Sequence, residues 1–424
     1  MATISNHIYD AHELYQKLFP PLLCTQRSSW EQGIAAQALL ETHQLFICQP
    51  SFLSDNPDIR LQCIYSLVHD AIVRQSSDGR LAVCLNGDGN SDHGAADPAC
   101  IGECFYYLLS RTLDMKNPTH GQRLHSSIDR MLRYTLEICP RAEYTIGCSY
   151  SSDDSRIILS HRTDGVEIWS DTLYMHPPFL ASSFVYYLHH PDTHADPMRL
   201  LRMCLHQVVL PADILQSQTG EWSHIYNLES KRFKRKAFWG VGNGWVCCGI
   251  IRMFRIFAAA IDEVTDDHPL VSAFIEEGID EWLEACYDIL LKTLSACFKH
   301  MRPDGLYHDI LDDTTSFVET NLSQQLSYTI YRLLSFQIAY SSTSSRVMEL
   351  LHVSCLDEAT IKEFESKAAV MYQAALKQTD SYGFVQGVCG SPNFDQPGTA
   401  TEGQAWGIMS AIARAEYYIR SENS

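Results

Sequence analysis

Apolar residues along the chain recur mostly with the spacing of helices, and the alternation typical of strands is a minor component. Polar, Gly-rich segments near 78–96, 216–237 and 302–308 separate the helical runs, and short returns lie between them. The expected helices cover roughly 9–18, 29–41, 61–74, 97–109, 124–138, 171 onward, 197–209, 246–260, 271–294, 322–340, 360–376 and 402–419.

Paired helices joined by loops of unequal length predict an all-α fold, a closed ring of helical hairpins with its chemistry at the long-loop end. No low-complexity segment or linker divides the chain. We therefore expect one domain over residues 1–424, although a chain of this length often holds more than one.

The net charge of −19 argues against a nucleic acid or an anionic membrane as partner, and the expected partner is a small-molecule or oligosaccharide substrate. The oligomeric state is left open by the sequence. The first residues lack a basic-then-apolar signal pattern, and no apolar run is long enough for a membrane helix. The 15 cysteines are scattered and do not form a secreted disulfide pattern, so we expect a cytoplasmic protein.

One carboxylate, Asp171, stands among aromatic residues at the start of an apolar helical run, between Trp169 and Tyr174. Desolvation by an apolar wall raises the pKa of a carboxyl group, as a general acid near neutral pH requires. The alternative is that Asp171 caps the helix, because Asp is favoured at the N-cap. A second acid, Asp97, has the same kind of position after a polar loop. Two such carboxyls in one pocket would suit glycosidic chemistry.

The segment from Phe238 to Trp245 reads Phe-Trp-Gly-Val-Gly-Asn-Gly-Trp. Its glycines and aromatic residues make it the clearest candidate for a ligand-binding segment in the chain. Glycines around Asn243 allow a tight turn and a close approach to a ligand, and the indoles of Trp239 and Trp245 offer faces that suit sugar rings. A structural turn with core tryptophans is the alternative. His224 follows Trp222 on the preceding long loop.

No cofactor and no metal are expected. The chain has no dinucleotide fingerprint and no Cys-x-x-Cys pair, and its one His-x-x-x-His spacing contains Pro191 and so does not lie on a helix.

Five short motifs in order resemble glycoside hydrolase family 105, the unsaturated rhamnogalacturonyl and related unsaturated uronyl hydrolases, close to family 88. The motifs are Ser29-Trp-Glu-Gln-Gly-Ile, Asp97-x-x-x-x-Gly102, Trp169-x-Asp-Thr-Leu-Tyr-Met175, Gly220-x-Trp-x-His224 and Phe238-Trp-Gly-Val-Gly-Asn-Gly-Trp245. The resemblance implies an (α/α)6 barrel of six helical hairpins and hydration of the C4–C5 double bond of a terminal unsaturated uronic acid.

By this resemblance Asp171 is the general acid/base and Asp97 assists it. Trp30, His224, Trp239, Asn243 and Trp245 are then the expected substrate-binding residues.

One position departs from the family pattern. The family usually has Trp-Ala-Arg-Gly-Asn-Gly-Trp, and this chain has Val241 where the arginine stands. Valine cannot bind a carboxylate with a fork of donors, so either another cation replaces it, with Arg162 or His161 as candidates, or the substrate differs. A repurposed barrel acting as a dehydratase, hydratase or cyclase on a non-sugar molecule is therefore a second hypothesis, and a silent binding protein is a third.

Overall fold

The computed structural model of the chain describes residues 2–47, 59–83, 92–112, 118–144, 156–190, 195–276, 278–340, 345–391 and 393–423. The helices are α1 (Ala2–Thr25), α2 (Ser29–Ile47), α3 (Ile59–Val73), α4 (Gly102–Thr112), α5 (Pro118–Arg133), α6 (Thr172–His189), α7 (Pro197–Leu215), α8 (Gly240–Asp262), α9 (Pro269–Phe274), α10 (Ile279–Phe298), α11 (Asn321–Tyr340), α12 (Arg346–Leu350), α13 (Glu358–Leu376) and α14 (Thr401–Asn423), with a 3-10 turn η2 (Asp97–Ala99) and a π turn η3 (Tyr134–Ile138). The strands are β1 (Arg141–Glu143), β2 (Ile157–Leu159), β3 (Glu167–Trp169), β4 (Ile225–Asn227), β5 (Arg232–Arg235), β6 (Tyr307–His308) and β7 (Val318–Glu319).

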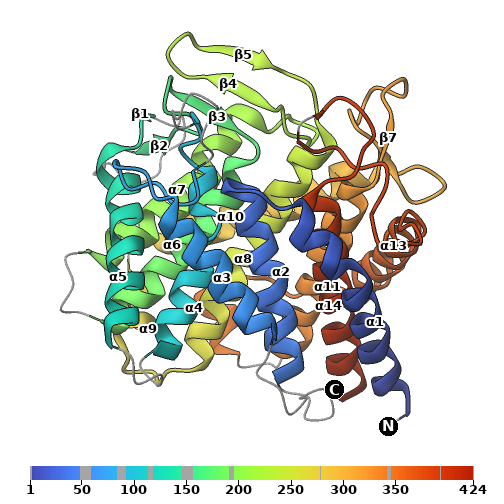
Figure 1. Cartoon of the computed structure of the whole chain (residues 1–424), viewed down its shortest axis with the longest axis horizontal. Helices are drawn as coiled ribbons and strands as arrows, with labels where there is room; N and C mark the ends of the chain where they lie inside the picture. Colours follow the sequence, from blue (N-terminus) through green and yellow to red (C-terminus); the bar gives the residue numbers. More distant parts are fainter. Residues whose placement is uncertain are drawn as a thin grey trace.

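The contacts between the helices arrange them in an inner and an outer ring, which Figure 1 shows from the side. Helices α2, α4, α6, α8, α11 and α14 pack in that order, and α14 packs on α2 to close the inner ring. Five outer helices pack on the inner helix that precedes them in the chain: α3 on α2, α5 on α4, α7 on α6, α10 on α8, and α13 on α11. The first helix, α1, packs on the last inner helix, α14. The chain thus runs through six hairpins, each with an outer helix followed by an inner one. The expected (α/α)6 barrel is confirmed.

The short strands gather at one end of the barrel, the upper end in Figure 1. In the described parts of the chain they make three small antiparallel sheets, ordered β1–β2, β3–β4–β5 and β6–β7. The β3–β4 pairing places Trp169 opposite Ile225. Because β3 leads directly into inner helix α6, this sheet joins the start of that helix to the long loop before α8.

Inner helices are buried on nearly all sides, so their sequences are apolar almost throughout, with small residues where backbones meet. On α8, a Cβ at Gly249 would lie 1.9 Å from the carbonyl oxygen of Leu173, so only glycine lets α8 pack this closely on α6. Helix α8 is also the one described helix long and apolar enough to cross a membrane, but 83% of its apolar window is buried inside the barrel.

Three details differ from the sequence-based expectation. The helix expected from Asp97 is a 3-10 turn, and α4 begins only at Gly102. The helix expected over 271–294 is divided into α9 and α10, because Gly278 has a left-handed backbone with φ of 82°. Helix α8 begins at Gly240, so the glycines of the Trp-rich segment form its first turn instead of a loop. The loop expected near 78–96 and the segment 142–168 fall partly on 84–91 and 145–155, which lie outside the described residues.

Candidate active site

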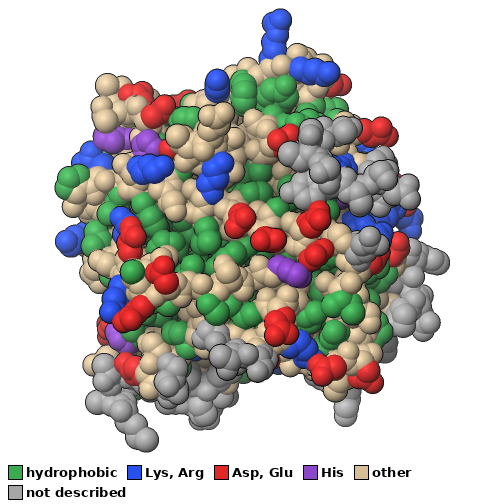
Figure 2. Space-filling view, turned by 180° about the vertical axis from the view of Figure 1, so that it is seen from behind, with side chains coloured by type: hydrophobic (Ala, Val, Ile, Leu, Met, Phe, Trp, Pro, Cys, Tyr) green, Lys and Arg blue, Asp and Glu red, His purple; other side chains and the backbone are tan. Residues whose placement is uncertain are grey.

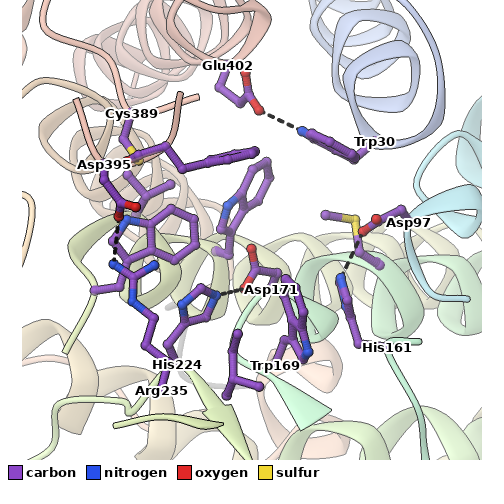
Figure 3. Close-up of a pocket in the computed structure, with 16 residues that line it drawn as sticks. Trp30, Asp97, His161, Trp169, Asp171, His224, Arg235, Cys389, Asp395 and Glu402 are labelled. Carbon is purple, nitrogen blue, oxygen red and sulfur yellow. Dashed lines mark hydrogen bonds and ion pairs between the residues drawn. The ribbon is translucent and has the colours of Figure 1, made fainter. Parts of the chain in front are cut away.

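A cavity of about 320 Å³ opens at the long-loop end of the barrel. Its lining combines indole rings with a few acidic and basic groups, the usual make-up of a small-molecule site. The lining residues are Trp30, Asp97, His161, Trp169, Asp171, Met175, His224, Ile225, Arg235, Trp239, Val241, Trp245, Cys389, Phe394, Asp395 and Glu402. Both predicted carboxyls and four of the predicted binding residues therefore share one cavity (Figure 3).

Asp171 is held at the end of the β3–β4 pairing. The backbone N–H of Ser170 donates to the carbonyl oxygen of His224 at 3.0 Å, and this bond places the Asp171 and His224 side chains beside each other. Asp171 occupies the N-cap position of α6, yet its side chain makes no capping hydrogen bond. The capping alternative is thus wrong for the side chain, which is directed into the cavity (Figure 3).

The charge on Asp171 is stabilised by its histidine neighbours. His224 Nε2 lies 3.3 Å from Asp171 Oδ2. Burial alone would raise the pKa of Asp171, but the close contact with the His224 imidazole, and to a smaller extent the nearby His161 ring, lower it below its ordinary value. The sequence-based expectation of a raised pKa is therefore wrong. An apolar wall is present in part, through Trp169 and Met175, and the histidines outweigh it.

The surroundings of Asp97 shift its pKa in the opposite direction. Burial, and then the negative charge of Asp171, raise its pKa well above the ordinary value. His161 Nε2 lies 3.3 Å from Asp97 Oδ1, and Nδ1 of the same ring lies 3.0 Å from the Thr172 hydroxyl. Burial lowers the pKa of His161 to about 4, so this imidazole is neutral at pH 7. The surroundings thus shift the pKa values of the two aspartates in opposite directions, so Asp171 is the more acidic group and Asp97 keeps its proton to higher pH.

Trp169 separates the two histidine–aspartate pairs. Its ring is stacked on His161 with centroids 4.5 Å apart and meets His224 edge-on at 5.4 Å. The indole N–H donates to Glu167 Oε2 at 3.1 Å. Because the indole contacts both histidines and is held by a hydrogen bond at its nitrogen, it sets the spacing between the two pairs.

The opposite wall comes from the two ends of the chain. Trp30 Nε1 donates to Glu402 Oε1 at 2.6 Å, which joins the start of α2 to the start of α14. Glu402 is 3% exposed, and burial raises its pKa to about 7. Its second oxygen, Oε2, has no hydrogen-bond partner among the described residues. Glu402 therefore adds another acidic group to the cavity lining, with one buried carboxyl oxygen that has no partner among the described residues.

Two predicted binding residues lie elsewhere. Asn243 is fully buried and does not line the cavity. Its side chain accepts from the backbone N–H of Trp222 at 2.7 Å and donates to the carbonyl oxygens of Trp222 and Trp239. Asn243 therefore holds the loop that carries His224, and the structure does not bring its side chain to the cavity surface.

Arg162 is likewise outside the cavity lining. Its guanidinium donates to both carboxylate oxygens of Asp164, at 2.9 and 2.8 Å, in a surface turn. His161 does line the cavity but is neutral, so neither candidate replaces the family arginine as a cation. Among the residues that line the cavity, the described part of the chain supplies one Arg or Lys side chain, Arg235.

Several cavity residues carried no signal in the sequence. Cys389, Phe394 and Asp395 come from the segment before α14, and Arg235 comes from strand β5. Within the described residues there is no group of three or more His, Cys, Asp or Glu side chains that could hold a metal ion.

Comparison with a family model gives a match over about half of the chain. Residues 127–351 match the family model described as Glycosyl Hydrolase Family 88. A search of curated proteins found no match.

Three similar solved structures show the same fold. A possible member of glycoside hydrolase family 105 from Salmonella enterica serovar Paratyphi A has a TM-score of 0.65 at 15% identity and covers 97% of this chain and 95% of its own. A family 88 glycosyl hydrolase from Bacteroides vulgatus has a TM-score of 0.58 at 12% identity and covers 98% and 99%. The unsaturated glucuronyl hydrolase of Bacillus sp. GL1, described as responsible for glycosaminoglycan degradation, has a TM-score of 0.57 at 11% identity and covers 97% and 96%.

Proposed function

Because the chain belongs to glycosyl hydrolase family 88, we propose that it is an unsaturated uronyl hydrolase that removes a terminal 4,5-unsaturated uronic acid from an oligosaccharide. The observation that carries the proposal is the pair of aspartates whose pKa values are shifted in opposite directions in one cavity walled by indoles. Two carboxyls whose pKa values are separated by their surroundings are the usual apparatus of acid–base catalysis.

The reaction needs one proton donor and one proton acceptor. A proton adds to C4 of the vinyl ether while the oxygen of water adds to C5 and loses its own proton. The C5 hemiketal then opens to a ketone, C1 is left as a hemiacetal, and collapse of that hemiacetal to an aldehyde expels the remaining saccharide as an alcohol. Water is consumed, and no other reactant is required.

The charge states divide these roles between the two aspartates. At neutral pH the Asp171 carboxylate takes the proton from water, and its contact with His224 stabilises the charge until then. Asp97 holds the proton that C4 receives. This division refines the assignment from the resemblance, in which Asp171 performs both transfers. Trp30, Trp239 and Trp245 provide faces for the sugar rings.

The experiment follows the ultraviolet absorbance of the conjugated C4–C5 uronate, which disappears on hydration. Unsaturated galacturonyl-rhamnose and an unsaturated glucuronyl disaccharide are tested side by side, with Asp171→Asn as control. Loss of absorbance with one of them, abolished in the variant, identifies both the reaction and the sugar. No loss with any unsaturated uronide contradicts the proposal.

We place the enzyme in the cytoplasm, in keeping with its buried free thiols.

One observation favours a second candidate. Met175, Val241 and Phe394 give the cavity apolar surface where a sugar site usually offers hydrogen-bond donors. A hydratase or dehydratase acting on a less polar small molecule would use the same pair of aspartates. The uronide assay separates the two functions, because only the first predicts loss of uronate absorbance.

A further inference from the structure

The cavity has a cationic side chain that comes from a different part of the fold than the position of the family arginine. Val241 lies on the first turn of α8 and cannot bind an anion. Arg235, at the end of β5, is the one Arg or Lys among the cavity-lining residues that the structure describes. Its guanidinium lies 5.9 Å from the ring centroid of Trp239, so the guanidinium and the predicted sugar-stacking surface are adjacent.

The ion pair between the Arg235 guanidinium and Asp395 is weak. Nη2 of Arg235 lies 3.4 Å from Oδ1 of Asp395, at the long end of hydrogen-bond distances. The Asp395 side chain is 84% exposed and that of Arg235 is 30% exposed. Exposed ion pairs contribute little, because water screens both charges. A ligand carboxylate that enters the cavity can therefore displace Asp395 from Arg235.

The surrounding strand is basic although the chain is strongly acidic. Five of the six residues from Lys231 to Lys236 are Lys or Arg, in a chain with a net charge of −19. Figure 2 shows Lys and Arg side chains projecting at the top of the molecule, the end at which Figure 1 shows the β4–β5 hairpin. This hairpin produces a local positive potential beside the cavity, which favours the approach of an anionic saccharide.

We propose that Arg235 is the carboxylate-binding residue of this enzyme, that it binds the uronate carboxylate in place of the family arginine whose position Val241 occupies, and that Asp395 pairs with Arg235 when substrate is absent. The inference rests on the proposed function and makes it more specific: the substrate is a free uronic acid, not its ester. Because the guanidinium fork binds a carboxylate with two parallel hydrogen bonds, an ester would lose one acceptor and the charge.

The test compares binding of an unsaturated glucuronyl disaccharide and its methyl ester, measured by calorimetry in an Asp171→Asn background in which the substrate stays intact. Arg235→Gln is expected to weaken binding of the acid by roughly ten- to a hundred-fold, the effect of losing hydrogen bonds to a charged group, and to leave the ester nearly unchanged. Asp395→Asn is expected to tighten binding of the acid selectively.

Arg232→Gln is the matched control, because Arg232 is an exposed residue of the same strand and does not line the cavity. It removes the same charge and should leave the acid-to-ester ratio of Kd values unchanged. Equal losses for acid and ester in Arg235→Gln, or no preference for the acid in the parent, overturn the inference. Turnover by the enzyme with Asp171 intact is measured separately, so failure of the proposed function is seen there and not in the Kd ratio.

Discussion

Nε2 of His224 lies 3.3 Å from Oδ2 of Asp171, and this contact decides which aspartate of the cavity carries charge. Burial acts on Asp171 and Asp97 in the same direction. The difference between them comes from neighbours: His224 opposes the effect of burial at Asp171, whereas the Asp171 charge adds to it at Asp97. The contact with His224 therefore lets Asp171 act as the base, while burial and the charge of Asp171 let Asp97 act as the acid.

Replacing His224 should move the acid side of the activity profile. Without His224 the pKa of Asp171 rises, so the carboxylate is lost at a higher pH and the acid limb of kcat/KM shifts upward in His224→Gln. The variant should also lose roughly 100-fold or more in kcat, within the range for impaired acid–base groups. His308→Gln is the control, because His308 lies on strand β6 and outside the cavity lining. An unshifted acid limb in His224→Gln would contradict the electrostatic role.

Asp97 should govern the opposite limb. Its raised pKa means that activity falls as pH rises through that value and the proton for C4 is lost. In Asp97→Asn this alkaline limb should disappear together with most of the activity, which a pH series of kcat/KM measures. If the residual activity keeps the same alkaline limb, Asp97 is not the proton donor and Asp171 performs both transfers.

Asn243 should matter for stability first and for catalysis through His224. Asn243→Ala leaves the backbone N–H and carbonyl of Trp222 without buried partners, so the free energy of unfolding should fall by about 2–4 kcal/mol. Released from Asn243, the loop no longer holds His224 beside Asp171, and kcat should fall in the folded fraction. Urea unfolding and steady-state kinetics measure both effects. Asn6→Ala, exposed on α1, should change neither.

Glu402 should make stability depend on pH. Its folded pKa of about 7 lies above the ordinary value of 4.5, so its contribution to stability is complete below pH 4.5 and is lost as pH rises through 7. The loss should be about 3 kcal/mol, because each unit of pKa difference corresponds to about 1.4 kcal/mol. Glu402→Gln cannot ionise. The stability difference between variant and parent should therefore change by this amount between pH 4 and pH 8, measured by urea unfolding, and a constant difference would refute the account.

Much of the fold was readable from the sequence, because inner helices bury all their faces and the polar loops between hairpins are long and rich in glycine. Local motifs also placed Asp97, Asp171, Trp30 and His224 in one site, since hairpin ends converge at one end of a barrel. Arg235 and Glu402 were not found, because their positions depend on how β5 folds over the cavity and on how α14 meets α2.

The charge on Asp171 was predicted in the wrong direction for a related reason. The sequence shows the aromatic residues next to it, whereas the histidine that lowers its pKa arrives through the β3–β4 pairing from a distant loop. Asn243 was misread because the glycines around it suggest a turn. The structure instead makes them the first turn of α8, where a Cβ at Gly242 would lie 2.3 Å from the Ser170 hydroxyl oxygen.

The central claim is that the enzyme hydrates the C4–C5 double bond and releases the saccharide as a consequence. The most direct measurement follows, in one reaction with an unsaturated uronyl disaccharide, both the loss of uronate absorbance and the appearance of the released sugar. Hydration predicts that one double bond is lost for each sugar released, and that Asp171→Asn abolishes both. Release of sugar with the absorbance retained would show ordinary glycosidic hydrolysis and would contradict the proposed mechanism.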